Sequence, residues 1–132
     1  MRALARVLFP ILVLAAPNAF AADQPATHQD VPVVLSNFNF NPNMLHLQRG
    51  APATLHLTNS ASGGHAFSAP ELFAASTISP EDRSKISNGR IEIAAGQTVD
   101  ITLTPMTAGT YAVVCTHFLH QSFGMRGSAV VE

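Results

Sequence analysis

The chain has 132 residues, with seven Lys or Arg against eight Asp or Glu, six histidines and a single cysteine. Its charges are few and dispersed, which argues against nucleic acid or an anionic membrane surface as a partner. A chain of this length is expected to form one globular domain.

Residues 1–21 have the three parts of an export signal. Arg2 and Arg6 supply a positive start, residues 7–16 form an apolar run, and residues 19–21 (Ala-Phe-Ala) form a small-x-small cleavage site. The apolar run is far shorter than the ~20 residues of a membrane helix, and Pro10 interrupts it. We therefore expect a cleaved signal peptide and a periplasmic protein without stable membrane association.

The remaining chain shows the pattern of an all-β domain. Residues 22–30 are polar and are predicted to form a flexible leader, and residues 31–132 show short apolar alternations separated by turn residues. They predict an antiparallel Greek-key β-sandwich or barrel of about seven strands, with a short helical excursion near residues 70–88. The expected strands cover residues 31–40, 44–48, 53–58, 90–94, 98–104, 109–115 and 126–131. Residues 59–64 are predicted to be a flexible connection that presents His65.

The single cysteine, Cys115, indicates metal chemistry. An odd cysteine in an exported protein is a free thiol, an intermolecular bridge or a metal ligand, and at the end of an apolar strand it could also be a small core residue. His120 and Met125 follow it closely, and thiolate, imidazole and thioether are ligands that copper prefers. A trigonal His₂Cys site with a long axial Met is the blue-copper arrangement, and His65 is the candidate for the second histidine.

The run from Cys115 to Met125 resembles the C-terminal copper loop of the cupredoxins. Four residues separate Cys115 from His120, as in azurin-like proteins, and four separate His120 from Met125, as in plastocyanin-like proteins. The mononuclear sites of multicopper oxidases combine these two spacings in the same way. The resemblance covers roughly residues 31–132 and implies one type 1 copper ion held by four ligands: His65, Cys115, His120 and Met125.

Three other residues near the predicted ligands affect this interpretation. His117 lies inside the loop and could displace His120, bind as an additional ligand, or support the site through hydrogen bonds from outside. Ala66 stands where cupredoxins often carry a polar residue that braces the cysteine loop. Gly124 is expected to let the backbone approach the metal.

The other histidines and methionines are expected to lie outside the site. His46 and His56 occupy the polar phase of alternating strands and are predicted to be solvated. His28, in the leader, could bind a stray copper ion. Met44 and Met106 are predicted to be packing residues.

The predicted site favours electron transfer over catalysis. With every coordination position filled, it offers a substrate no open place, so we do not expect an enzyme. The single cysteine excludes a dinuclear centre bridged by two cysteines, and the absence of a His-x-His pair excludes an oxygen-reducing cluster. Phe118, Leu119 and Phe123 near His120 would form an apolar patch suited to brief docking with a cytochrome or copper enzyme, unless they are core residues.

The sequence leaves two other functions open. One is a periplasmic copper-binding or copper-tolerance protein that sequesters or delivers the ion. The other is a metal-free β-sandwich interaction module, which would leave the Cys-His-Met spacing to chance. We expect an exported, monomeric one-electron carrier.

Overall fold

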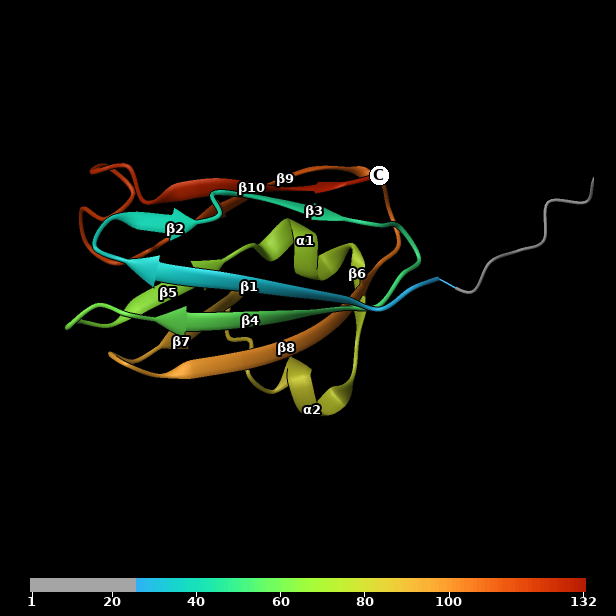
Figure 1. The fold of residues 1–132 in the computed structure, drawn as a ribbon, viewed down its shortest axis with the longest axis horizontal. Coiled ribbons are helices and arrows are strands. Elements are labelled where there is room, and N and C mark those ends of the chain that lie inside the picture. Colours follow the sequence, from blue (N-terminus) through green and yellow to red (C-terminus); the bar gives the residue numbers. More distant parts are fainter. Residues whose placement is uncertain (1–25) are drawn as a thin grey trace, which may run out of the picture.

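Two β-sheets pack face to face in a computed structural model that describes residues 26–132 (Figure 1). The predicted signal peptide lies outside the described residues. Among residues 26–132 no helix is both long and apolar enough to span a bilayer. The strands are β1 (Gln29–Ser36), β2 (Asn39–Asn41), β3 (Met44–Leu47), β4 (Ala53–Asn59), β5 (His65–Ser68), β6 (Ser76–Ile78), β7 (Arg90–Ile93), β8 (Thr98–Pro105), β9 (Gly109–Val114) and β10 (Arg126–Val131), and the helices are α1 (Pro70–Ala74) and α2 (Pro80–Arg83).

Each sheet joins strands that are distant in sequence. The first sheet has the order β2-β1-β4-β8-β6 and the second has the order β3-β10-β9-β5-β7. Most neighbours are antiparallel, but β1 runs parallel to β4 and β3 runs parallel to β10. The all-β sandwich is confirmed. The two parallel pairs differ from the antiparallel expectation because the chain crosses from one sheet to the other between β2 and β3.

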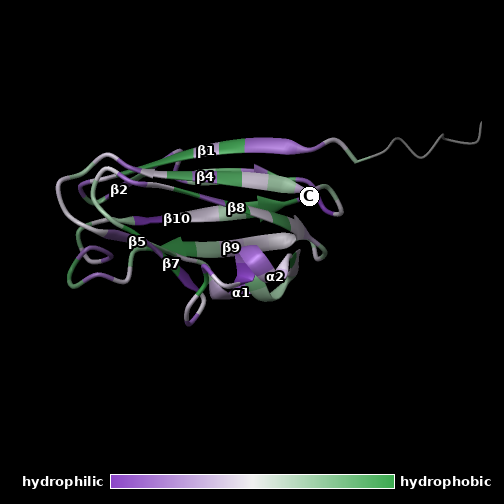
Figure 2. Ribbon diagram, turned by 90° about the horizontal axis from the view of Figure 1, so that it is seen from below, coloured by the Kyte–Doolittle hydropathy of each residue, from purple (hydrophilic) through white to green (hydrophobic). Residues whose placement is uncertain are grey.

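The core lies between the sheets and follows the alternation of the sequence. On β4, Leu55 and Leu57 are buried, and the residues between them are half-exposed. Figure 2 shows hydrophobic residues recurring along the strands of both layers. Burying one such leucine contributes about 1.5–3 kcal/mol relative to leaving it exposed.

The ten strands of residues 26–132 exceed the expected seven by three short strands, β2, β5 and β6, each missed for its own reason. The expected strand 31–40 is split at Phe38, whose φ of 59° turns the chain back as β2. Strand β5 is buried at all four positions, so polar residues do not alternate with apolar ones. Strand β6 lies within the expected helical excursion and pairs with β8. Strand β1 begins at Gln29, inside the segment expected to be a leader.

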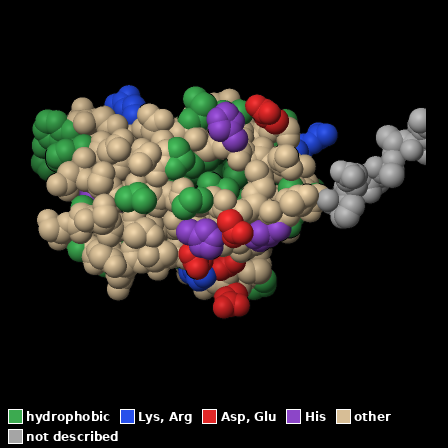
Figure 3. Space-filling view, in the orientation of Figure 1, with side chains coloured by type: hydrophobic (Ala, Val, Ile, Leu, Met, Phe, Trp, Pro, Cys, Tyr) green, Lys and Arg blue, Asp and Glu red, His purple; other side chains and the backbone are tan. Residues whose placement is uncertain are grey.

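A group of histidine and acidic side chains lies on the outer face of the first sheet (Figure 3). Nδ1 of His56, on β4, is 2.8 Å from a carboxylate oxygen of Asp100 on β8, and its Nε2 is 3.0 Å from a carboxylate oxygen of Asp30 on β1. Hydrogen bonds to Asp30 and to Asp100 raise the pKa of His56. His56 is therefore a link between three strands rather than a freely solvated residue, whereas His46 on β3 is exposed.

We expect His56→Gln to destabilise the fold in a pH-dependent way. Because the pKa of His56 is raised in the folded state, its stabilising contribution is complete below the ordinary value of about 6.5 and is lost as the pH rises through the raised value. At low pH the substitution should lower the free energy of unfolding by about 0.2–1 kcal/mol, the range typical of exposed ion pairs. Thermal unfolding followed by circular dichroism at pH ~6 and pH ~8.5 measures the difference. His46→Gln is the control, and an equal effect of His56→Gln at both pH values would contradict the assignment.

Candidate metal centre

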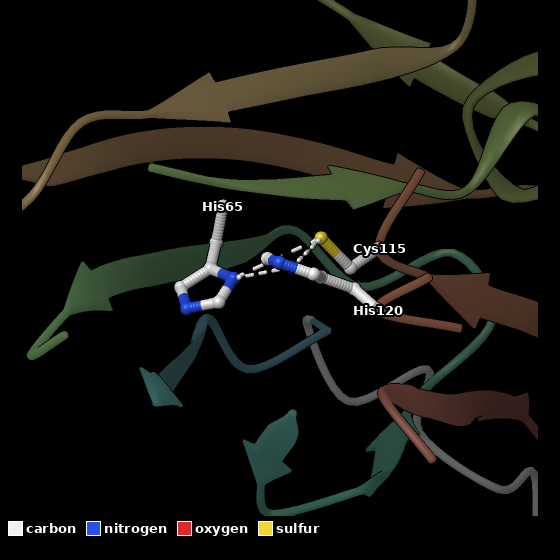
Figure 4. Close-up of side chains that lie close together, drawn as sticks. All are labelled: His65, Cys115 and His120. Atoms are coloured by element: carbon white, nitrogen blue, oxygen red, sulfur yellow. Dashed lines mark hydrogen bonds between the residues drawn. The ribbon is translucent and has the colours of Figure 1, made fainter. Parts of the chain in front are cut away.

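Three of the four predicted ligands meet at one end of the sandwich. His65 begins β5, Cys115 directly follows β9, and His120 lies in the loop between β9 and β10. Nδ1 of His65 is 3.2 Å from Nδ1 of His120, and Sγ of Cys115 is 3.8 Å from the first nitrogen and 3.4 Å from the second. Figure 4 shows the three donor atoms pointing toward one another. The structure thus brings together residues that are 50 positions apart in the chain.

These distances fit a single transition-metal ion. A triangle with these sides has its centre about 2.0 Å from every corner, close to the metal–nitrogen and metal–sulfur distances of about 2.0–2.1 and 2.3 Å in tetrahedral zinc sites. Two imidazoles and one thiolate are also the equatorial donors of a type 1 copper site. The residues present therefore fit the implied cofactor.

The surroundings of His65 favour a neutral ring with Nδ1 available to a metal. Burial is the main cause that lowers the pKa of His65, followed by the nearby His120 and His117. In the described part of the chain, the buried Nε2 of His65 has no hydrogen-bond partner. A neutral tautomer with its proton on Nε2 leaves the Nδ1 lone pair directed at the cluster.

The sulfur of Cys115 receives a hydrogen bond from the main chain. The side chain is fully buried, and the backbone N–H of Ala66 lies 3.4 Å from Sγ and donates to it. The thiolate is the form of cysteine that ligates a metal. Ala66 has no polar side chain to brace the loop, but its main chain connects β5 to Cys115.

Met125 lies at the base of the ligand loop. Its side chain is fully buried, its N–H donates to the carbonyl of His120 at 3.0 Å, and its carbonyl accepts from the N–H of Cys115 at 3.1 Å. Met125 is thus tied through its main chain to two of the predicted ligands, and its role as axial ligand stays a prediction. A side chain at Gly124 would meet no atom of the described chain within 4 Å, and the expectation that Gly124 lets the backbone approach the metal stays a prediction. Gly124 has a φ of +99°, a backbone conformation that residues with side chains rarely adopt.

His117 is not one of the three converging donors. Its Nε2 is 2.8 Å from a carboxylate oxygen of Glu92 on β7. Its ring stacks on His120, with centroids 5.4 Å apart and an interplanar angle of 26°. In this arrangement His117 supports the site from outside and does not add a donor to it.

The connection that presents His65 is held by one buried side chain. Asn59 is fully buried, and its amide nitrogen donates to the carbonyls of Gly63 and Ile93 at 2.8 and 2.9 Å. Its side-chain oxygen accepts from the N–H of Ala61 at 2.9 Å. Residues 59–64, expected to be a flexible connection, are therefore braced against the end of β7.

We expect Asn59→Ala to lower the free energy of unfolding by about 3 kcal/mol, because it removes three hydrogen bonds, of which the one to Ile93 is buried. Urea unfolding of the metal-free protein measures this change. Ser60→Ala, which removes one longer hydrogen bond to Leu35, is the matched control and should cost less. A loss no larger than that of the control would show that Asn59 does not brace the connection.

Exposed apolar side chains lie on the ligand loop and on the β1–β2 turn next to it. We call them the apolar rim: Phe38, Phe118, Leu119 and Phe123. Phe118 and Phe123 are 87% and 62% exposed, so their alternative assignment as core residues was wrong. Phe38, from the β1–β2 turn, packs edge-on against His120 and tilts against Phe123, with centroid distances of 5.2 Å in both cases. Phe38 is far from the ligand loop in sequence, and no local pattern indicated its place at the site.

The sequence as a whole belongs to a known family. The profile of the cupredoxin-like domain family matches residues 4–131, so the chain belongs to this family and the resemblance seen in the ligand loop is confirmed. A search of curated proteins found no match.

Solved structures confirm the fold. Dithionite-reduced auracyanin from Roseiflexus castenholzii superposes with a TM-score of 0.61 at 16% identity, over 81% of this chain and 98% of the other. Auracyanin A from Chloroflexus aurantiacus gives 0.56 at 24% identity, over 80% and 100%. The blue copper oxidase of Nitrosomonas europaea gives 0.62 at 17% identity, over 80% of this chain but only 39% of that one. At these identities the matches show a shared fold.

Proposed function

We propose that this chain is an exported mononuclear type 1 copper protein that carries one electron at a time. The observation that carries the proposal is the convergence of two imidazole nitrogens and one thiol sulfur around a point at bonding distance from all three. Copper bound there would supply the redox step by changing between Cu(I) and Cu(II). The description of auracyanin A as a "blue" copper protein supports the same assignment.

The predicted ligands differ in how far they are buried, and we propose a different role for each. His65 and Cys115 are buried and keep water from the donor atoms, while the half-buried His120 connects them to the surface. A water-free site with donors fixed by the fold changes little in geometry when an electron arrives or leaves. Met125 is proposed as the weak axial ligand, since its backbone is bonded to both Cys115 and His120.

The apolar rim is proposed as the docking surface for a redox protein partner. It consists of four exposed side chains, of which Phe38 packs against His120, Phe123 packs against Phe38, and Phe118 and Leu119 precede His120 in the loop. Two of them, Phe38 and Leu119, have positive φ values of 59° and 62°, a strained conformation for residues other than glycine. A small apolar contact of this kind suits a transient complex in which His120 lies closest to the partner.

Electron transfer accounts for the described site better than copper handling or catalysis. Glu92 engages Nε2 of His117 and His117 is not among the converging donors, which weakens the case for copper sequestration. The multicopper oxidases share the fold, but the chain spans less than half of their length. A fully ligated centre leaves no position for a substrate, so we propose a carrier, monomeric and periplasmic, rather than an enzyme.

Cys115→Ser should abolish the intense visible absorption that we expect from the wild-type protein loaded with Cu(II). The band arises from charge transfer between thiolate and copper, and serine supplies no thiolate. Absorption spectroscopy after titration with Cu(II) measures it, and a band that survives the substitution would exclude Cys115 as a ligand.

His120→Ala should alter the spectrum more than His117→Ala; the reverse order would reassign the ligand.

Replacing Phe118 and Phe123 by serine should slow electron self-exchange between reduced and oxidised protein by about tenfold, because the apolar contact through which two copies meet is lost. Nuclear magnetic resonance line broadening in mixtures of the two redox states measures the rate. Met106→Ser, at an exposed residue after β8, is the control. An unchanged rate would place electron transfer at another surface.

Carrier and copper handler are separated by the phenotype of a deletion strain. Rapid reversible reduction by a cytochrome or copper enzyme supports a carrier. Copper-sensitive growth without a respiratory defect would instead support copper handling.

A further inference from the structure

The ligand loop contains two histidines, His117 and His120, whose rings both lie near His65. The rings of His117 and His120 are stacked, and the centroids of His117 and His65 are only 6.4 Å apart. A change in the side-chain torsions of His117 would turn a ring nitrogen toward the donor cluster. Because His117 is tethered to the same loop, its effective concentration at a bound ion would be high. His117 is therefore expected to join the metal ligands unless another residue holds its ring away.

We propose that Glu92 holds His117 outside the coordination sphere, so that His120 is the histidine ligand from the loop. This inference rests on the proposed copper function. The Nε2–H of His117 donates to Glu92 at 2.8 Å while its ring stacks on His120 at an interplanar angle of 26°. Glu92 is thus a positioning residue, which acts on the metal centre only through His117.

The fold places Glu92 where it can act on the loop. Glu92 lies on the edge strand β7, directly opposite Ala66, the residue that follows His65. Its second oxygen is 3.5 Å from the guanidinium of Arg90, which also donates to the hydroxyl of Thr116 at 3.2 Å. Two contacts from one short strand therefore hold consecutive loop residues, Thr116 and His117. We call Arg90, Glu92, Thr116 and His117 the loop clamp.

The clamp opposes the coordination that Cu(II) would otherwise favour. Cu(II) with nitrogen and oxygen donors prefers square-planar or tetragonal geometry, whereas a trigonal His₂Cys site is typical of electron-transfer centres. A third imidazole at the ion would shift the site toward the tetragonal form. Holding His117 away thus preserves the trigonal donor set of His65, Cys115 and His120.

Absorption and electron paramagnetic resonance spectra of the Cu(II)-loaded protein test the proposal. Glu92→Ala should change the ratio of the two main thiolate bands by about twofold or more and enlarge the copper hyperfine splitting, as expected for added nitrogen coordination. Glu92→Gln keeps an oxygen acceptor for His117 and should retain the wild-type spectrum. Glu81→Ala, at an exposed glutamate on α2, is the control for removal of a carboxylate.

The double variant Glu92→Ala/His117→Ala decides whether His117 is responsible. It should restore the wild-type spectrum, because the competing ring is gone. A spectrum of Glu92→Ala equal to that of the wild type, or a change that persists in the double variant, would overturn the proposal.

A measurement on the metal-free protein separates this inference from the proposed function. Nitrogen chemical shifts of the His117 ring should show a proton on Nε2 hydrogen-bonded in the wild type and in Glu92→Gln, and should change in Glu92→Ala. Unchanged shifts in Glu92→Ala would refute the clamp whether or not copper binds. A wild-type protein without the visible band would refute the copper function alone, because these shifts do not depend on metal.

Discussion

The backbone hydrogen bond from Cys115 to the carbonyl of Met125 is the constraint on which the site depends. It extends the antiparallel pairing of β9 and β10 by one step, beyond Val114 and Arg126, and closes the intervening residues into a loop. Within this loop the N–H of Met125 bonds to the carbonyl of His120. Three predicted ligands are thereby held by main-chain hydrogen bonds.

The fourth predicted ligand joins them only because the second sheet is complete. His65 begins β5, which pairs with β9 where Ser68 meets Val114, directly before Cys115. Asn59 fixes the approach to His65 from one side, and Ala66 bonds to the cysteine sulfur on the other. The donor geometry is thus a property of tertiary structure. The loop carries three of the predicted ligands, and the packing of the second sheet sets their distance from His65.

The sequence predicted the chemistry well and its supports poorly, for a physical reason. The spacing of Cys115, His120 and Met125 is local and can be recognised in the sequence. Alternating strands such as β4 have a two-residue period that can also be recognised without the structure. Strand β5 carries no such period because both of its faces are buried. Glu92 and Phe38 reach the site through strand pairing and a turn, respectively, and neither position has a local pattern that links it to the ligand loop.

The positive φ values of Phe38 and Leu119 have a consequence for the speed of electron exchange. A backbone held in an uncommon conformation by the surrounding fold has few alternatives, so these two side chains are pre-organised on the rim before any encounter. For the proposed carrier, the chain itself would then lose little conformational entropy when it meets a partner, and a complex with few specific contacts could still form in a defined orientation. Few specific contacts would also let such a complex separate quickly.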